Sequence, residues 1–194
     1  MNIGFTKKAQ SALNKALYFA SQMGHTSVGS EHLLLGLLSE GDGIACRVLE
    51  ERGVTYDKTY ELLEENVGIG DATILNPGDI TPRTKKIIEA SAGVAVRMKN
   101  GYIGTEHLLM GILREGGNMA LRILRTMGVD PKKMYSSIVK KLNDTPHTVT
   151  SGVSAANRES DKKNKALAEF TRDLTEAART GKLDPVIGRE KEIQ

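Results

Sequence analysis

An internal duplication constrains this sequence more than any other feature. A shift of 75 positions aligns residues 5–64 with residues 80–139 without a gap, and 19 of the 60 aligned positions are identical. The similarity is densest where GSEHLLLGLLSEGDGIACRVL (29–49) lies on GTEHLLMGILREGGNMALRIL (104–124). The chain is therefore expected to fold as two related halves built on one plan.

Each copy has the apolar pattern of four helices. In the first copy, Thr6 is expected to cap a helix with a face of alanines and leucines. Ser30 is expected to cap a second helix, from Glu31 to about Glu40. A short third helix should end at Gly53, and a fourth should cover about Tyr56 to Glu65.

The second copy repeats these signals. Thr81 is a cap followed by Pro82 at the first helical position, where a missing N–H costs nothing. Gly128 again ends a helix, and Pro131 follows Asp130 at the start of the last one. The Gly- and Asn-rich stretch 66–79 reads as a loop, and strand signals are almost absent. The sequence predicts an all-α fold, with two tandem, pseudo-equivalent four-helix repeats that share one core.

The composition divides the chain into three parts. Residues 1–142 should form the duplicated domain, with repeats at about 5–65 and 80–142. Residues 143–166 are polar and poor in large apolar side chains, which is typical of a flexible linker. Residues 167–194 regain helical periodicity and should form a short helical segment.

Composition also excludes several functions. The net charge is only +3, tryptophan is absent, and no Lys/Arg run is interleaved with aromatic residues, so nucleic acid is not an expected partner. The longest apolar run is far shorter than the roughly 20 residues that span a bilayer. The N-terminus reads as an amphipathic helix and not as a signal peptide. We therefore expect a cytoplasmic protein with no membrane contact.

Catalytic motifs are missing from the sequence. No glycine-rich loop ends in Gly-Lys-Ser/Thr, so the chain alone is not expected to bind a nucleotide cofactor or to be an enzyme. The adjacent pairs Glu31-His32 and Glu106-His107 should project in different directions from a helix, and no second histidine follows four residues later, which predicts no metal site. Both histidines should pack or form hydrogen bonds in the first turn. A catalytic use of Glu106-His107 is an alternative that requires a pocket with a perturbed carboxylate.

The two glutamates have two open interpretations. Each directly follows the Ser or Thr that is expected to cap its helix, and the helix dipole alone favours a carboxylate there. The duplication, however, repeats the whole G-[ST]-E-H-L-L unit, which is more than a dipole requires. This second observation favours a binding role for Glu31 and Glu106.

These units also resemble a known family. The paired G-[ST]-E-H-L-L-x-G-[LI]-L-x-E-G units are similar to the double Clp N-domain of Clp-type AAA+ unfoldases. The tail TRDLTEAARTGKLDPVIGREKEIQ resembles the entrance to their first ATPase module. GLLSEGDGIACRVLEERGV and ITPRTKKIIEAS are most similar to the ClpC branch. The resemblance implies a substrate- and adaptor-binding N-domain, followed by a linker and an incomplete ATPase entrance.

The resemblance also implies partners. The complete protein would be a hexameric unfoldase that uses ATP and magnesium and feeds the ClpP peptidase, whereas the isolated chain would be a monomer that binds adaptors such as MecA. Val186, Ile187, Gly188 and Arg189 match the segment beside the adenine of ATP, a role open only to the complete protein. The alternative is a free-standing accessory protein that regulates a Clp complex, which would have no reason to keep LDPVIGR.

Finally, the resemblance suggests a ligand. ClpC-type N-domains of Gram-positive bacteria recognise phosphorylated arginine, which needs an anion near its guanidinium group and N–H donors near its phosphate. In this sequence, the resemblance implies that Glu31 and Glu106 face the guanidinium group. It implies that the phosphate is bound by Thr6, Lys7, Thr81 and Arg83. The duplication implies two such sites, and they should be unequal because Pro82 replaces Lys7.

Overall fold

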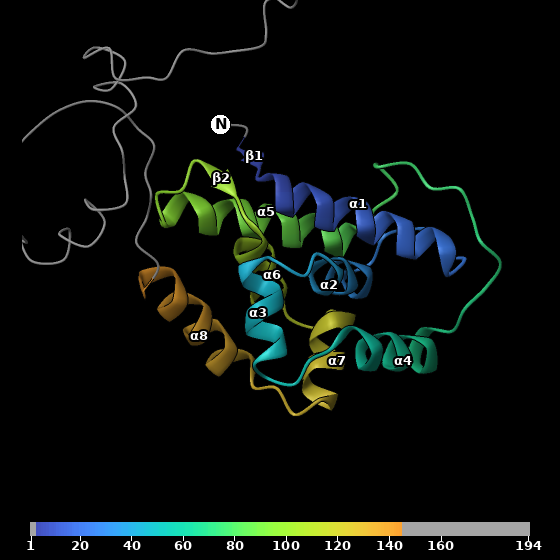
Figure 1. Cartoon of the computed structure of the whole chain (residues 1–194). Helices are drawn as coiled ribbons and strands as arrows, with labels where there is room; N and C mark the ends of the chain where they lie inside the picture. The colour runs from blue at the N-terminus through green and yellow to red at the C-terminus, as the bar shows by residue number, and fades with distance from the viewer. Residues whose placement is uncertain (1–2, 145–194) are drawn as a thin grey trace, which may run out of the picture. The chain divides into compact units, whose positions relative to one another are not determined.

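Helices make up almost all regular structure in residues 3–144, the part of the chain that the computed structural model describes (Figure 1). The first repeat contains β1 (Gly4–Phe5), α1 (Lys7–Gln22), α2 (Ser30–Ser39), α3 (Ile44–Glu50) and α4 (Tyr56–Val67). The second contains α5 (Pro82–Arg97), β2 (Tyr102–Ile103), α6 (Thr105–Arg114), α7 (Met119–Thr126) and α8 (Pro131–Asp144). The expected all-α class with four helices in each repeat is confirmed. No helix in this range is both long and apolar enough to span a bilayer.

The ends of several helices form as the sequence predicts. Thr6 Oγ1 accepts the N–H of Ala9 at 3.2 Å, and Thr81 Oγ1 accepts the N–H of Thr84 at 3.1 Å. Gly53 and Gly128 adopt φ values of +73° and +76°, the left-handed conformation that ends a helix most easily at glycine. The predicted linker 143–166 and helical segment 167–194 lie outside the described residues, apart from residues 143 and 144, which end α8.

The predicted cap of α2 is wrong by one residue. Gly29 has the extended backbone of a capping residue, and Ser30 is already the first residue of the helix. The N–H of Gly29 donates to Nδ1 of His32 at 2.9 Å, so the histidine side chain accepts a backbone N–H at the start of the helix. The second repeat does the same with Gly104 and His107, which also share a 2.9 Å hydrogen bond. Glycine has no side chain that could accept an N–H of the first turn, so only the reciprocal bond of a capping box forms, from the glycine N–H to the third-position histidine.

A glycine in each repeat lets two helices cross closely. A Cβ on Gly36 would lie 2.2 Å from the carbonyl oxygen of Ala12, at the contact between α1 and α2. The equivalent Cβ on Gly111 would lie 2.2 Å from Ser91 Oγ, at the contact between α5 and α6. The glycine in the repeated L-L-x-G motif is therefore a packing residue.

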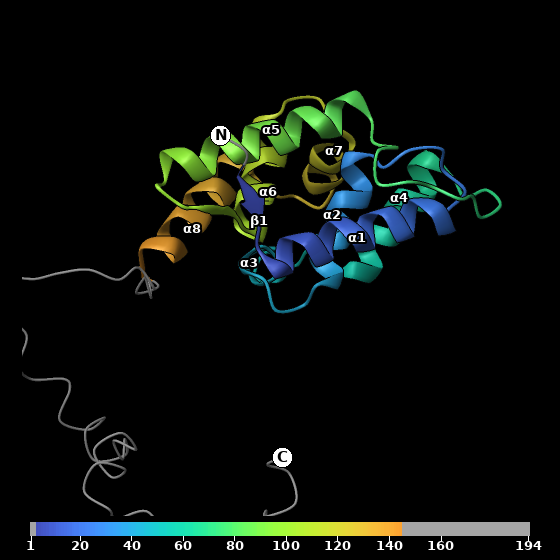
Figure 2. The same cartoon turned by 90° about the horizontal axis from the view of Figure 1, so that it is seen from above.

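Both repeats contribute to one hydrophobic core. A single cluster of buried side chains includes Leu33, Leu35, Leu108 and Leu109, each fully buried, together with residues from every helix. Figure 1 shows α1 and α5 lying over α2 and α6, and Figure 2, seen from above, shows α1 and α5 as two separate long helices. The expected shared core is confirmed, because neither half encloses its apolar face alone.

Two short backbone pairings join the repeats. Phe5 pairs in parallel with Ile103, and Val28 forms a parallel bridge with Ile80. The shift of 75 positions converts one pairing into the other, since Phe5 corresponds to Ile80 and Val28 to Ile103. The first helix of each repeat therefore begins beside the segment that precedes the second helix of the other repeat.

Candidate functional site

The predicted site residues form two groups that cross the repeat boundary. The N–H of Thr6 donates to the carbonyl oxygen of Ile103 at 2.9 Å, which places the start of α1 just before Gly104 and α6. The N–H of Thr81 donates to the carbonyl oxygen of Val28 at 3.1 Å, which places the start of α5 just before Gly29 and α2. We name the first group, Thr6–Lys8 with Gly104–His107, the Glu106 corner. The second group, Thr81–Arg83 with Gly29–His32, is the Glu31 corner.

Packing within the first repeat keeps Thr6 away from Glu31. Helix α1 runs antiparallel to α2, because Lys8 contacts Asp42 beyond the end of α2 while His25 contacts His32 at its start. Thr6 therefore lies at the opposite end of α2 from Glu31. The residues that one repeat contributes to the proposed phosphate side and the glutamate of the same repeat do not meet.

The carboxylate of each glutamate folds back over the start of its own helix. A Cβ on Gly29 would lie 1.9 Å from Glu31 Oε1, and a Cβ on Gly104 would lie 2.1 Å from Glu106 Oε1. The neighbouring hydroxyls of Ser30 and Thr105 donate to these carboxylates at 3.1 and 3.4 Å. The glutamate side chains are only 13% and 14% exposed. The glycine of G-[ST]-E-H thus provides the space in which the carboxylate lies.

The expectation that each glutamate and its histidine point apart is wrong. His32 Nδ1 lies 3.5 Å from Glu31 Oε1, and His107 Nδ1 lies 3.2 Å from Glu106 Oε1. The two side chains meet because both turn back toward the N-terminus of the helix. The contact brings a carboxylate against a ring nitrogen that already accepts a glycine N–H.

Nδ1 of each histidine accepts a glycine N–H and therefore carries no proton, so both rings are neutral at this contact. Burial, and secondly the charge of His25, lower the pKa of His32 to about 3. Burial also lowers the pKa of His107, against the opposing charge of Glu106. Neither ring is then a counter-ion, so within residues 3–144 the two glutamate carboxylates have no cationic side chain in contact.

The Glu106-His107 pair does not have the geometry of a catalytic acid and base. The ring of His107 is 1% exposed. Its Nδ1 accepts from Gly104, and its Nε2 lies 2.9 Å from the amide of Asn100. Both ring nitrogens therefore already have hydrogen-bond partners within the protein. Among the described residues there is also no cluster of three or more His, Cys, Asp or Glu side chains that could hold a metal ion.

The two corners differ in the backbone donors that they offer. In the first turn of α1, the N–H groups of Lys7 and Lys8 have no acceptor within the described part of the chain. At the start of α5 only the N–H of Arg83 is in this state, because Pro82 has no N–H and Thr84 donates to Thr81. Free N–H groups at a helix start attract anions. The start of α1 therefore contributes two such donors to the Glu106 corner, and the start of α5 contributes one to the Glu31 corner.

The cations of the two corners also differ. The Lys7 side chain is exposed, whereas Arg83 donates from Nη1 to the carbonyl oxygen of Gly116 at 2.9 Å. The position equivalent to Arg83 is Lys8, which the sequence analysis missed and which the shift of 75 positions identifies. Lys8 forms an ion pair with Asp42 at 2.7 Å. In both repeats this second cation ties the start of the first helix to the loop after the second helix.

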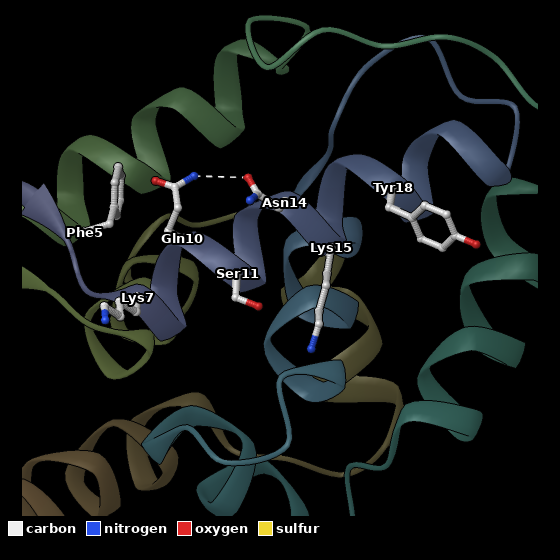
Figure 3. A pocket seen from close by; sticks show the side chains of 7 residues that line it. All are labelled: Phe5, Lys7, Gln10, Ser11, Asn14, Lys15 and Tyr18. Atoms are coloured by element: carbon white, nitrogen blue, oxygen red, sulfur yellow. Dashed lines mark hydrogen bonds between the residues drawn. The ribbon is translucent and has the colours of Figure 1, made fainter. Parts of the chain in front are cut away.

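A shallow groove continues from Lys7 along the outer face of α1 (Figure 3). Its volume is about 610 Å³, and it is lined by Phe5, Lys7, Gln10, Ser11, Asn14, Lys15 and Tyr18. Gln10 donates to Asn14 at 3.1 Å along the helix, and Lys15 donates to the carbonyl oxygen of Ser39 at 2.8 Å. Lys7 is the lining residue that belongs to the Glu106 corner as well. The predicted nucleotide-adjacent residues Val186, Ile187, Gly188 and Arg189 lie outside the described residues.

Comparisons with known proteins agree on one family. The sequence profile described as "Clp repeat (R) N-terminal domain" matches residues 4–77 and 79–175. Over 190 residues, or 98% of the chain, the sequence is 40% identical to "ATP-dependent Clp protease ATP-binding subunit ClpA homolog" of Guillardia theta. It is also 40% identical over 190 residues to "Negative regulator of genetic competence ClpC/MecB" of Bacillus subtilis. The match covers 23% of each of these relatives, so the chain spans about a quarter of their length.

A solved structure supports the same assignment at the level of the fold. The N-terminal domain of the chaperone ClpD from Arabidopsis thaliana superposes with a TM-score of 0.59 at 22% sequence identity. The superposition covers 72% of the present chain and 94% of the ClpD chain. The arrangement of helices described above is therefore one that a solved Clp N-terminal domain also has.

Proposed function

The chain belongs to the Clp repeat N-terminal domain family, and we propose that it is the substrate- and adaptor-binding N-domain of a ClpC-like, ATP-dependent unfoldase. The complete protein would bind ATP and magnesium in its ATPase modules, assemble as a hexamer and deliver proteins to ClpP. In this proposal the chain itself is a binding module, and its three-part division at about residues 142 and 166 separates that module from the ATPase entrance.

We further propose that the two corners bind phosphoarginine side chains on marked proteins. The observation that carries this proposal is the backbone pairing of Thr6 with Ile103, which brings the start of α1 beside the segment that leads into α6, where Glu106 lies in the first turn. A phosphoarginine side chain is a cation joined to an anion, and it needs both charges matched within one small site. The corner has a carboxylate without a cationic partner on one side and a helix start on the other.

The phosphate would lie at the start of α1. The N–H groups of Lys7 and Lys8 point out of the first turn without acceptors among the described residues, and the helix dipole adds to their attraction for a dianion. The Lys7 ammonium group is exposed and can approach the same phosphate. The guanidinium group would then approach Glu106, whose carboxylate remains 14% exposed.

The two corners should differ in affinity. Pro82 removes one N–H from the start of α5, and Arg83 is already hydrogen-bonded to Gly116. A hydrogen bond to a charged group contributes about 1.5–3 kcal/mol. The loss of one phosphate donor should therefore make the Glu31 corner weaker than the Glu106 corner by roughly tenfold or more.

The groove along α1 is the surface that we propose for the residues next to the marked arginine and for adaptors of the MecA type. It begins at Lys7, so a polypeptide held in the Glu106 corner can continue into it. Its far end is formed by Tyr18, whose ring is 59% exposed. An exposed aromatic ring of this kind offers apolar contact area to a partner at little entropic cost.

A labelled peptide tests the proposal directly. The peptide carries either one phosphoarginine or an unmodified arginine, and its binding to the chain is followed by fluorescence anisotropy. We expect saturable binding of the phosphorylated peptide alone, and its loss in the double variant Glu31→Ala with Glu106→Ala, while the helical circular dichroism is nearly unchanged. Equal binding of both peptides, or full binding by the double variant, would refute the phosphoarginine sites.

A further inference from the structure

Two histidines form a continuous hydrogen-bonded chain in the first repeat. The N–H of Gly29 donates to Nδ1 of His32 at 2.9 Å. Nε2 of His32 lies 2.6 Å from Nδ1 of His25, and Nε2 of His25 lies 3.1 Å from the carbonyl oxygen of Gly68. The chain thus connects the start of α2 with the loop that follows α4.

The direction of these bonds follows from their two ends. Gly29 can only donate, so Nδ1 of His32 accepts and its Nε2 carries the proton. Nε2–H of His32 then donates to Nδ1 of His25, which leaves Nε2–H of His25 to donate to Gly68. Every bond is satisfied only when both rings are neutral. A proton added to Nδ1 of His25 would face the N–H of His32 at 2.6 Å.

The two rings differ in their access to solvent. His32 is 1% exposed, whereas His25 is only partly buried at the end of α1. His25 is thus the ring through which protons can reach the chain of bonds. Burial and the neighbouring His25 lower the pKa of His32, which agrees with a ring held neutral in the fold.

The same loop is fastened to the end of α1 near His25. Gly70 N–H donates to Met23 and Thr73 N–H donates to Ser21, each at 2.9 Å. Thr73 Oγ1 donates to the carbonyl oxygen of His25, also at 2.9 Å. The loop then continues to Ile80, which pairs with Val28 at the Glu31 corner. Release of the loop at His25 therefore frees a segment that ends in that corner.

Few other titratable groups face this pair. From α2, Glu31 Oε1 lies 3.5 Å from His32 Nδ1, which is the nearest carboxylate contact given by the structure. From the loop, Asp71 presents its backbone oxygen to Gly24. From the end of α4, Glu64 accepts the N–H of Gly68 through its carbonyl oxygen. Among the described residues, the carboxylate in contact with the pair is that of Glu31, and it meets the His32 ring at Nδ1, the nitrogen that does not face His25.

The second repeat contains an internal comparison. His107 occupies the position of His32, but Asn100 occupies the position of His25 and lies 2.9 Å from Nε2 of His107. An amide side chain does not titrate between pH 4 and pH 8, so this pairing cannot respond to a proton at that position. The partner of the first-turn histidine is therefore a titratable ring in the first repeat and an amide in the second.

We propose that His25 and His32 form an acid-sensitive latch, which holds the loop 66–73 and the Glu31 corner closed when both rings are neutral and releases them when His25 binds a proton. The Glu106 corner has no such latch, because Asn100 replaces His25. Acidification would then act on one of two related corners.

Amide hydrogen exchange at Gly70 and Thr73 tests the latch without any ligand. The closed arrangement has no room for a proton on Nδ1 of His25. An exposed histidine in general has a pKa near 6.5, so proton uptake favours the open state by about tenfold at pH 5.5. We expect the protection factors of these two amides to fall by about tenfold between pH 7.5 and pH 5.5. The matched variant His25→Asn, which copies Asn100, should remove this pH dependence. The same fall in the variant as in the parent would overturn the proposal.

The ring tautomers give a second test on the unaltered chain. Nitrogen-15 spectra should show His25 and His32 both protonated at Nε2 at pH 7.5. A proton on Nδ1 of His32 at that pH would contradict the direction of the chain of bonds, whether or not the variant folds.

The effect on ligand binding rests on the proposed function. If the corners bind phosphoarginine, lowering the pH from 7.5 to 5.5 should weaken the Glu31 corner more than the Glu106 corner, and His25→Asn should remove this difference. Absence of phosphoarginine binding at both corners and at every pH would refute the proposed function, while the exchange and tautomer measurements would still decide the latch.

Discussion

The backbone N–H of Thr6 donates to the carbonyl oxygen of Ile103 at 2.9 Å, and this bond joins two residues that are 97 positions apart in the sequence. Its equivalent is the bond from Thr81 to Val28 at 3.1 Å. Both bonds place the capped start of a first helix beside the glutamate of the other repeat. Each corner is therefore made by two repeats, so a single repeat does not contain a complete one.

The glycines at the helix crossings should be essential for stability. Gly36→Ala places a methyl group 2.2 Å from the carbonyl oxygen of Ala12, and the backbone of α1 must move. We expect the free energy of unfolding in urea to fall by about 1–3 kcal/mol. Gly93→Ala in α5 is the matched control, since its Cβ meets nothing within 4 Å. That variant should gain about 0.5–1 kcal/mol from helix propensity. Equal effects of both variants would contradict the packing role.

Gly104 should be needed for binding rather than for folding. The methyl group of Gly104→Ala would occupy the space of the Glu106 carboxylate, which can move because it ends a flexible side chain. We expect the affinity of the Glu106 corner for phosphoarginine to fall about tenfold or more, a loss of roughly 1.4 kcal/mol. A double-mutant cycle with Glu106→Gln supplies the control. If Gly104→Ala acts by displacing the carboxylate, it should cost nothing further once Glu106 is replaced.

Pro82 should limit the affinity of the Glu31 corner for phosphoarginine. Pro82→Ala restores an N–H at the start of α5, next to the free N–H of Arg83. In a Glu106→Gln background, where only the Glu31 corner remains, we expect calorimetry to show phosphoarginine binding about tenfold tighter. Unchanged affinity would mean that the phosphate does not lie at this helix start.

Stability should depend on pH through the two first-turn histidines. The pKa of His32 is lowered from 6.5 to about 3 in the fold, and that of His107 is also lowered. The unfolded chain therefore binds more protons than the folded chain, and stability is lost as the pH falls from about 6.5 toward 3. At pH 5.5 the loss relative to pH 7.5 should be about 1.4 kcal/mol for His32. His107 should add a loss of the same sign.

Three carboxyl groups with lowered pKa values titrate below this pH range. The pKa values of Glu40, Asp42 and Asp130 are lowered from values of 4.5 and 3.8, so these groups act at lower pH. His107→Gln is the control, since glutamine at this position can also accept the N–H of Gly104 but does not titrate. Urea unfolding at both pH values should show the variant with a smaller loss than the parent. An equal loss of stability in the variant and in the parent would exclude His107 as a source of the pH dependence.

The sequence was sufficient to predict the parts of the fold that local chemistry determines. Thr6 and Thr81 cap their helices through their own hydroxyls, and Gly53 ends a helix because it can adopt a positive φ. The duplication itself predicted two equivalent halves with one core. These features depend on residues within one helical turn or on repetition along the chain.

The features that join distant segments could not be predicted in this way. The pairings of Phe5 with Ile103 and Val28 with Ile80 are too short to leave an alternating pattern in the sequence. The cap of α2 was misplaced because Ser30 is a common capping residue, whereas the side chain that serves the helix start belongs to His32. The contacts of His25 could not be predicted either, because packing brings its partners His32 and Gly68 to it.

Calorimetric titration of the chain with free phosphoarginine, with arginine and phosphate as separate controls, tests the central proposal most directly. We predict saturable binding that approaches two equivalents with unequal affinities, no binding of either control, and one remaining site in each of the variants Glu31→Ala and Glu106→Ala. The tighter site should be the one that Glu106→Ala removes. No heat of binding in the parent chain, or two intact sites in either variant, would contradict the assignment of the two corners as phosphoarginine sites.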